Sequence, residues 1–563
     1  MHRLLKLRTF PALALATLLI TAAAAQDDRR NIRNGYDIPS ENYADQPYVV
    51  VRDDGAWVCT LTTGTGHEGK PGQHVVATIS EDKGKTWSPL IDIEPADGPE
   101  ASWVVPFITP DGRIYGFYSY NGDRLEPRAD MLGWYCYRYS DDGGKTWSER
   151  GRLPMRVTAA DRGNDWDGEH QIFWGICKPI ASGDDVFWAF TKLGKYMLDL
   201  GEGWVYRSNN LLTETDPEKL HWELLPEGDH GIRHPDFGSV QEEHNIVALD
   251  NGGLFCMYRT TQGFPAQSYS RNRGKNWSLP EPAVYRPGGR QFKHPRACPR
   301  IWKVRHGHYL FWFHNHGGTT YKERNPVWIS GGIEHDGRIH WSEPEILLYD
   351  PDIDIRMSYP DLIVEDSRYF FTETQKKMAR VHEAEPMRIE GLWKQFDIAE
   401  RAAGGIVLAD GSAAPAIPRL DANGGFTIEV ADVQPREAGT VLFSTAGPSG
   451  RGVTLTHAEG GALRMAFSDG THEASWASDP LPQDEAVDVA VIVDGGPDVI
   501  VFVVDARVCD GGEARQYGWG RFPRAMGDVT GAGLCDVAAN AAIWFYPRAI
   551  TVTEAIGNHR AAM

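Results

Sequence analysis

The sequence predicts an all-β protein in which a six-bladed β-propeller is followed by a β-sandwich of the jelly-roll type. Three observations predict this class. The chain has 563 residues, which is too long for one ordinary hydrophobic core. Its 60 glycines and 19 tryptophans suit many short strands joined by turns better than helices. A ten-residue phrase also recurs along the first two thirds of the chain.

The N-terminal segment predicts export. Basic residues at His2, Arg3, Lys6 and Arg8 precede a short apolar run that ends in alanines. This pattern is typical of a secretory signal peptide, so we expect residues 1–25 to be removed. The apolar run is short for a membrane-spanning helix, and no cysteine follows it for lipidation. We therefore expect a secreted or periplasmic protein without membrane insertion.

The charge balance narrows the class of partner. The formal net charge is -20 and no basic run occurs, so the sequence argues against nucleic acid and anionic membranes as partners. An acidic oligosaccharide or polysaccharide is compatible with this charge, because a few arginines in one pocket can bind a carboxylate.

The seven cysteines do not predict a disulfide scaffold. Their number is odd, and their spacings are wide and unlike those of a zinc ribbon. Five lie in apolar, strand-like runs such as "GAWVCTLTT", so we expect small buried hydrophobic side chains. The sequence leaves open a pair between Cys509 and Cys535.

The recurring phrase is a structured turn. It reads "SEDKGKTWSP" at residues 80–89, "SDDGGKTWSE" at 140–149 and "SRNRGKNWSL" at 270–279. The serine and aspartate side chains can bond nearby backbone amides, and the glycine allows a tight turn. The tryptophan is then free to pack into a sheet. We predict that these phrases close the outer turns of blades and contribute to stability rather than to chemistry.

The phrases belong to larger units of about four strands each. Successive units are marked by tryptophans that lie 60, 75, 55 and 64 residues apart, at Trp87, Trp147, Trp222, Trp277 and Trp341. Repeats of this length are typical of a β-propeller. Five units are complete, and a sixth, starting at "SYPDLIVED", needs an N-terminal strand to close the ring. A seventh blade is the alternative if the insertion near residues 161–170 contains one.

The repeated turn resembles the Asp-box, or BNR repeat, of the sialidase superfamily over roughly residues 40–390. This resemblance implies a sialidase-type propeller, which we assign to residues 26–395, and an exo-glycosidase acting on a carboxylate-bearing sugar. Asp-boxes also occur in propellers of polysaccharide lyases. The resemblance therefore implies the fold more strongly than the reaction.

The composition changes after about Ile398. Alanine and glycine increase, and strand-like runs such as "GFTIEVADV" and "DVIVFVVDARV" alternate with turns, which predicts an antiparallel sandwich. This segment, residues 396–563, resembles a laminin-G or concanavalin-like jelly-roll module. Carbohydrate binding and a purely structural role beside the propeller are both left open for it.

A site is expected where the inner strands of the propeller begin, because these ends surround one central funnel. The starts of these strands carry polar groups in otherwise apolar runs. They are Asp45, Gln46, Glu100, Lys178, Glu242, Glu243, His244, Asn245, His294, Arg296, Tyr359 and Asp361.

The resemblance to sialidases implies roles for some of these residues. Tyr359 takes the place of the nucleophilic tyrosine, and Glu243 that of the base which activates it. Arg259, with Arg296 or Arg356, would bind the substrate carboxylate. Further substrate contacts are expected from Asp45, Gln46, His244 and Tyr120. The alternative is structural: a core tyrosine, and an ion pair between Glu243 and Arg259.

The first unit departs from the sialidase pattern. Its inner strand reads "YADQPYVVV" without the expected arginine, and the following loop, "GTGHEGKPGQHVV", carries His67 and His74. Histidine can act as an acid or a base near neutral pH, so β-elimination at a uronic acid is an alternative reaction, with Tyr118 or Tyr120 assisting. The resemblance here is to lyases that act on rhamnose–glucuronate glycans or ulvan. A non-catalytic glycan-binding propeller is the third hypothesis.

The reaction requires no cofactor under any of these hypotheses, and we leave open a structural calcium or zinc ion. The weak candidate for zinc is a cluster of four residues, namely His294, Cys298, His314 and His316. Packed, hydrogen-bonded rings are the alternative for this cluster.

Overall fold

The computed structural model describes residues 28–126, 128–195, 199–408, 417–533, 536–537 and 542–562. The predicted signal peptide and Cys535 lie outside the described residues. Strands make up 43% of the protein and helices 7%, which confirms the all-β class.

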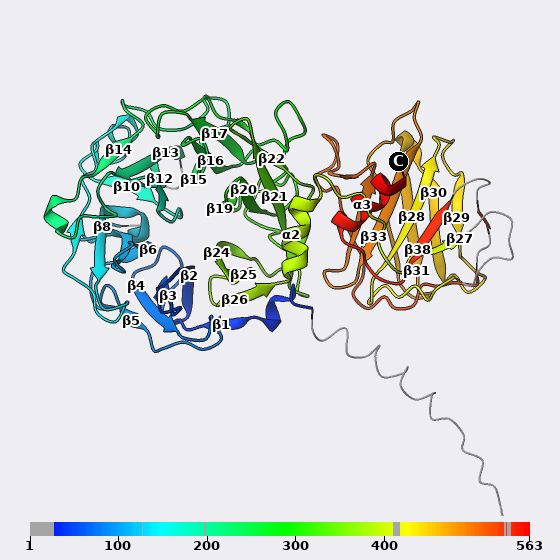
Figure 1. Cartoon of the computed structure of the whole chain (residues 1–563), viewed down its shortest axis with the longest axis horizontal. Coiled ribbons are helices and arrows are strands. Elements are labelled where there is room, and N and C mark those ends of the chain that lie inside the picture. The colour runs from blue at the N-terminus through cyan, green and yellow to red at the C-terminus, as the bar shows by residue number, and fades with distance from the viewer. Residues whose placement is uncertain are drawn as a thin grey trace, which may run out of the picture.

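The first two thirds of the chain form a ring of antiparallel meanders (Figure 1). The first comprises β2 (Tyr43–Val51), β3 (Trp57–Gly64), β4 (Gln73–Ser80) and β5 (Ile91–Asp92). The second comprises β6 (Ala101–Ile108), β7 (Ile114–Tyr120), β8 (Leu132–Ser140) and β9 (Gly151–Arg152). The third comprises β11 (Ile180–Ser182), β12 (Asp185–Lys195), β13 (Asp199–Ser208) and β14 (Glu223–Leu225).

The remaining meanders have the same plan. The fourth comprises β15 (Gln241–Ala248), β16 (Leu254–Thr260), β17 (Ala266–Ser270) and β18 (Glu281–Pro282). The fifth comprises β19 (Arg300–Arg305), β20 (His308–Phe313), β21 (Val327–His335), β22 (Arg338–Trp341) and β23 (Glu345–Leu348). The last comprises β24 (Ser358–Glu365), β25 (Arg368–Thr374) and β26 (Ala379–Ala384), together with β1 (Tyr36–Ile38).

The ring is closed by the pairing of β1 with β26, which places Tyr36 opposite Val381. The last meander is thus completed by an N-terminal strand, as its truncated sequence requires. The first and last meanders are also neighbours, because β2 contacts β24. The insertion near residues 161–170 overlaps α1 (Ala159–Arg162) and precedes β10 (Gln171–Trp174), which pairs with β8 and β12 and so joins two meanders.

The repeated phrases form the outer turns that come after the third strands. In the first phrase the Gly84 amide donates to Ser80 Oγ at 2.8 Å, and the Thr86 amide donates to Asp82 Oδ1 at 2.8 Å. The second phrase repeats both bonds, and the third repeats them with Asn272 in the position of the aspartate. Each turn is therefore built from local side-chain to backbone bonds, as its sequence predicts.

Four inner strands carry a β-bulge near their first residues. The register shifts in β2, β6, β15 and β24, and in each bulge one residue has a positive φ. These residues are Gln46 (52°), Trp103 (64°), Glu243 (56°) and Tyr359 (46°). A bulge leaves one residue outside the ladder and redirects its side chain, and such strained backbone is common at functional sites. The shared bulge therefore identifies the funnel end of the ring.

The C-terminal third forms two antiparallel sheets packed face to face. The larger sheet comprises β27 (Ile406–Leu408), β28 (Phe426–Val433), β33 (Val487–Asp494), β34 (Val499–Val504), β35 (Arg507–Val508), β36 (Gly520–Arg521) and β38 (Ile543–Tyr546). The smaller comprises β29 (Val441–Ser444), β30 (Gly452–His457), β31 (Leu463–Ser468), β32 (Glu473–Ala477) and β37 (Asp536–Val537). Ile428 and Phe502 of the larger sheet share one buried core with Leu455 and Met465 of the smaller.

The two-sheet unit packs tightly against the ring, with α2 (Pro386–Lys394) and α3 (Val552–Ala562) at the junction (Figure 1). One apolar cluster includes Trp328 of the ring and Ile492 of the two-sheet unit. Polar contacts reinforce it: Arg30 pairs with Asp494 at 2.5 Å, and Arg290 donates to the Val508 carbonyl at 2.7 Å. Within the described residues, no helix is long and apolar enough to cross a membrane.

Candidate active site

A cavity of about 380 Å³ lies at the funnel end of the ring. Six of its twelve lining residues are cationic and one, Glu68, is acidic. The lining residues are Glu68, Arg128, Trp174, Arg259, Arg296, Tyr321, Arg324, Arg356, Ser358, Tyr359, Gln375 and Lys376. Such a surplus of positive charge favours an anionic ligand, even though the whole chain is acidic.

Tyr359 and Glu243 meet at this cavity from opposite parts of the sequence. Each lies in a bulge of an inner strand, and the Tyr359 hydroxyl donates to Glu243 Oε1 at 2.8 Å. The other carboxylate oxygen of Glu243 is buried and has no hydrogen-bond partner among the described residues. Burial raises the pKa of Glu243 above its usual range, although Arg259 opposes the shift. Burial and the neighbouring Glu243 charge also raise the pKa of Tyr359, so its phenol is neutral.

Arg259 is already paired with carboxylates of the protein. Its Nη1 lies 2.6 Å from Glu243 Oε1, and its Nη2 donates to Glu242. Arg296 shares that second carboxylate, with Nη2 3.1 Å from Glu242 Oε1. Arg259 therefore orients Glu243 and neutralises two buried acids, besides lining the cavity.

Arg324 is a buried cation without an ion pair in the described part of the chain. Its Nη1 donates to Ser358 Oγ at 2.6 Å and its Nη2 to the Arg296 carbonyl at 2.9 Å, while its Nε has no partner there. Burial lowers the pKa of Arg324, and the neighbouring charges of Arg259 and Arg356 add to this effect, although Glu243 opposes it. A buried guanidinium that lines a cavity and has no direct ion pair among the described residues is suited to bind a carboxylate.

Lys376 supplies a further cation where the first inner strand lacks an arginine. Its Nζ lies 2.7 Å from Asp45 Oδ2 and 3.2 Å from Glu68 Oε2, and 4.3 Å from the centre of the Tyr359 ring. Burial would raise the pKa of Glu68, but Lys376 and Arg128 outweigh it and lower that pKa. Glu68 thus places a carboxylate at the cavity, from the loop between β3 and β4.

Sequence reasoning missed Arg324, Lys376 and Glu68. Arg324 and Lys376 lie in loops that come after β20 and β25, whereas site residues were expected at the starts of inner strands. A signal for Glu68 was available, since it is the acidic residue in "GTGHEGKPGQHVV". The interpretation of that loop was based on its two histidines instead.

Three predicted substrate contacts lie beside or behind the cavity rather than lining it. Asp45 holds Lys376, and the Gln46 amide donates to the Gly175 carbonyl at 2.9 Å. His244 is buried, with Nδ1 2.9 Å from the Thr191 hydroxyl, and burial lowers its pKa to about 3. His244 is therefore neutral and joins two meanders.

The residues proposed for β-elimination do not come together at the cavity. His67 is exposed in its loop, and His74 is buried on β4 with Nε2 3.5 Å from Asp92 Oδ1. Tyr120 lies on β7 beneath Arg150, whose Cζ is 3.5 Å from the ring centre, and the Tyr118 hydroxyl donates to Glu94. None of these four is among the residues that line the cavity.

The cluster suggested for zinc is held by other contacts. His294 Nε2 lies 2.9 Å from the Ala297 carbonyl and His316 Nε2 2.8 Å from the Glu323 carbonyl, while the His294 and His314 rings stack at 5.8 Å. Cys298 is a buried free thiol, as are the other five described cysteines. No group of three or more potential ligands among the described residues could hold a metal ion. The four residues suggested as weak zinc ligands therefore do not form such a group, and the rings of His294 and His316 bond to the main chain instead.

The order of the meanders, the outer turns and the central site together allow a comparison with known families. Residues 102–371 match the BNR repeat-like domain. The prediction of Asp-box, or BNR, repeats in the propeller is therefore confirmed over this range. This BNR propeller holds the cationic cavity at the starts of its inner strands.

Among solved structures, the chain is similar to a protein of unknown function from Dyadobacter fermentans, at 16% identity and a TM-score of 0.46, covering 62% of this chain and 97% of that one. It is also similar to the Hadza microbial sialidase Hz136, at 16% identity and a TM-score of 0.44, covering 61% and 66%. A third similar structure is Trypanosoma rangeli sialidase in complex with the inhibitor DANA, at 11% identity and a TM-score of 0.43. The match covers 92% of this chain and 93% of that one. No curated protein matches the sequence.

Proposed function

We propose that the protein is an exported glycoside hydrolase that releases a terminal, carboxylate-bearing sugar in the manner of a sialidase. The observation that carries this proposal is Arg324, a buried cation without an acidic partner in the described chain, which lines one cavity with Tyr359. The Tyr359 hydroxyl bonded to Glu243 supports a nucleophile with its base.

The carboxylate of the substrate explains why a tyrosine suits this site. In a sialic acid the carboxylate is attached to the anomeric carbon, so an ionised aspartate or glutamate nucleophile would be repelled. Tyr359 is neutral because burial raises its pKa, and it approaches without that repulsion. Arg324 and Lys376 would bind the substrate carboxylate beside it.

The proposed reaction proceeds in two displacements. The Tyr359 oxygen attacks the anomeric carbon while Glu243 accepts the phenolic proton, and Glu68 gives a proton to the departing glycosidic oxygen. Water then attacks the sugar–tyrosine bond, giving its proton to Glu68, while Tyr359 recovers its proton from Glu243. Binding of the substrate carboxylate between Lys376 and Arg324 would weaken the hold of Lys376 on Glu68 and favour its protonated form.

The domain assignment belongs to the same proposal. We interpret the successive meanders as six blades, within residues 26–395, and the two-sheet unit, within residues 396–563, as a concanavalin-like module. The basic and apolar pattern of residues 1–25 supports export.

Hydrolysis is favoured over the two alternative hypotheses. β-Elimination depends on His67 and His74, and neither lines the cavity. A purely binding propeller would not need a buried tyrosine bonded to a buried carboxylate, because that pair serves proton transfer rather than recognition.

A product assay tests the proposal. Purified protein is incubated with a sialylated oligosaccharide and, separately, with uronate-containing polysaccharides, and the products are separated by chromatography. We expect free sialic acid and no near-ultraviolet absorbance. An unsaturated, absorbing uronate would instead show a lyase, and binding without either product would show a lectin.

A further inference from the structure

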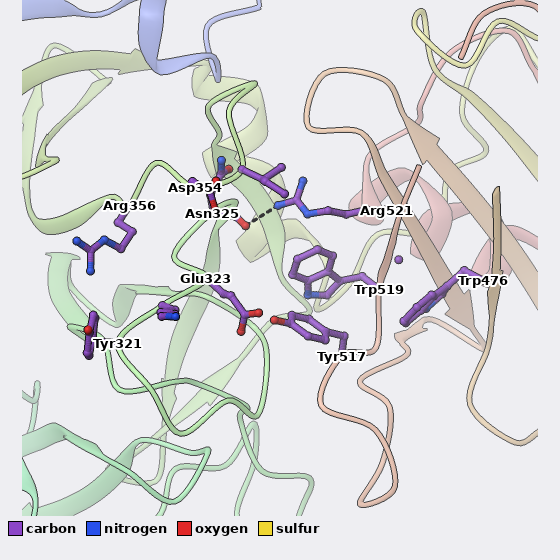
Figure 2. Close-up of a pocket in the computed structure, with 12 residues that line it drawn as sticks. Tyr321, Glu323, Asn325, Asp354, Arg356, Trp476, Tyr517, Trp519 and Arg521 are labelled. Carbon is purple, nitrogen blue, oxygen red and sulfur yellow. Dashed lines mark hydrogen bonds between the residues drawn. The ribbon is translucent and has the colours of Figure 1, made fainter. Parts of the chain in front are cut away.

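A second cavity, of about 700 Å³, lies between the propeller and the two-sheet unit (Figure 2). Its walls combine propeller side chains such as Glu323 and Asp354 with Trp476, Tyr517 and Trp519 of the two-sheet unit. The volume falls within the range of about 300–1,000 Å³ that is usual for small-molecule sites.

This interdomain cavity adjoins the funnel cavity. Tyr321 and Arg356 line both of them, and Arg356 Cζ lies 5.5 Å from the centre of the Tyr321 ring. Both side chains are exposed, Tyr321 to 51%. Figure 2 shows this pair across the cavity from Trp476 and Trp519. A ligand that leaves the funnel past Tyr321 and Arg356 therefore enters the interdomain cavity.

Three aromatic side chains of the two-sheet unit contribute to its wall, and their orientations are fixed by neighbours. The Trp519 indole donates to the Asn315 carbonyl at 2.8 Å, and the Trp476 indole to the Gly518 carbonyl at 3.2 Å. The Tyr517 ring meets Trp519 edge-on at 5.1 Å. Trp519 is buried, so it supports the wall, whereas Trp476 and Tyr517 are half-buried. Because the Trp476 N–H group is already bonded, apolar ring surface is what this side chain offers to a ligand.

The charges of the interdomain cavity nearly balance. Glu323 and Asp354 face Lys322, Arg356 and Arg521, whereas the funnel has six cationic residues and one acidic residue. Two of these charges are already engaged: Arg521 donates to the Asn325 carbonyl at 2.6 Å, and Glu323 accepts from Gln516 at 3.0 Å. Such a site suits an uncharged ligand with many hydroxyl groups, which can exchange hydrogen bonds with both signs of charge.

We propose that the interdomain cavity is a subsite for the uncharged hexose or hexosamine residues that are linked to the acidic sugar bound in the funnel. The apolar C–H faces of pyranose rings match the aromatic surface, and their hydroxyls match the mixed charges. The substrate is then an extended oligosaccharide with a terminal acidic sugar. This inference rests on the proposed function for the identity of the sugar in the funnel.

Kinetics with two substrates test the subsite. Sialyllacto-N-tetraose spans both cavities, and 4-methylumbelliferyl sialoside fills the funnel only. We expect Trp476→Leu, which keeps an apolar side chain but loses the aromatic face, to lower kcat/KM for the oligosaccharide about tenfold and to leave the aryl sialoside unchanged. Trp476→Phe keeps an aromatic face and should retain most of the wild-type kcat/KM for the oligosaccharide. Trp544→Ala, which removes a half-buried tryptophan elsewhere in the same unit, should change neither value.

Calorimetric binding of the neutral tetrasaccharide lacto-N-tetraose separates this inference from the proposed function. We expect the wild type and Trp544→Ala to bind it, and Trp476→Leu to bind at least tenfold more weakly. If this pattern holds but no substrate is cleaved, the subsite stands and the proposed hydrolase fails. If the wild type does not bind the tetrasaccharide, the inference is overturned. This result needs only the wild-type protein, so it holds whether or not the Trp476 variants fold.

Discussion

The two cavities share a wall, yet they differ in how they can select a ligand. The funnel gathers six cationic side chains around a tyrosine–glutamate pair, whereas the interdomain cavity combines nearly balanced charges with aromatic surface. The funnel side chains stand on bulged inner strands and loops of one ring, while the second cavity needs both units of the chain. Under the proposed function, charge selects the sugar to be cleaved, and aromatic contact selects the sugars to which it is attached.

The largest expected effect separates chemistry from binding. Tyr359→Phe removes the proposed nucleophile and should lower kcat/KM for both the aryl sialoside and the oligosaccharide by about a thousandfold or more, equally for the two. Steady-state kinetics measure this. Tyr48→Phe is the matched control, because the Tyr48 hydroxyl is buried without a partner in the described structure and its loss should be nearly neutral. More than a tenth of wild-type activity in Tyr359→Phe would contradict the assignment.

Arg324→Lys should have the next largest effect. Lysine keeps the charge but cannot bind a carboxylate through two parallel hydrogen bonds, so we expect kcat/KM to fall about a hundredfold on both substrates. Arg305→Lys serves as control, since Arg305 pairs with Glu390 on the outside of the ring. An unchanged affinity for the acidic sugar, measured by calorimetry, would remove Arg324 from the site.

Glu68→Gln should distinguish the substrates by their leaving groups. A sugar hydroxyl leaves poorly without a proton, so kcat/KM for the oligosaccharide should fall about a hundredfold. The methylumbelliferyl group leaves as a stable anion, so kcat/KM for the aryl sialoside should fall less than about tenfold. Glu81→Gln, at an exposed position in the first outer turn, is the control. Equal losses on both substrates would show that Glu68 does not protonate the leaving group.

The smallest expected effect is on stability, and it concerns Glu100, which supports the loop that carries Glu68. Buried Glu100 accepts hydrogen bonds from the Gly72 and Gln73 amides, at 3.1 and 3.4 Å, and burial raises its pKa from 4.5 to about 8. The folded protein thus binds one more proton than the unfolded chain between these values, so this group lowers stability as pH rises from about 4.5 to 8.

Glu100→Gln keeps an acceptor but does not titrate. Thermal unfolding at pH 5 and pH 9 should show a smaller fall in Tm for the variant than for the wild type. At pH 9 the variant should be more stable by on the order of 2 kcal/mol. Parallel profiles for the two proteins would show that Glu100 does not titrate in this range.

The fold could be predicted from the sequence because its signal is local. The bonds of the Asp82 turn lie within one ten-residue phrase, so the phrase indicates the turn without knowledge of the rest. The starts of the inner strands could be located from the sequence for a similar reason. Tyr359 and Glu243 begin two such strands, and both could be named from the sequence, although their catalytic roles stay predictions.

The rest of the site depends on how distant loops meet when the ring closes. Lys376 reaches Asp45 across the junction of the first and last meanders, and nothing near either residue indicates this contact. Arg324 was missed because its loop has no repeated pattern. His74 was proposed for catalysis because it shares the glycine-rich stretch "GTGHEGKPGQHVV" with His67, but it belongs to strand β4 and does not line the cavity.

Covalent trapping tests the role of Tyr359 as nucleophile most directly. Wild-type protein and Tyr359→Phe are incubated with 2,3-difluorosialic acid, digested and mapped by mass spectrometry. We expect one sugar per wild-type chain, attached to Tyr359, and none on the variant. A sugar attached to another residue, or no adduct on a wild-type protein that still releases sialic acid, would contradict this role.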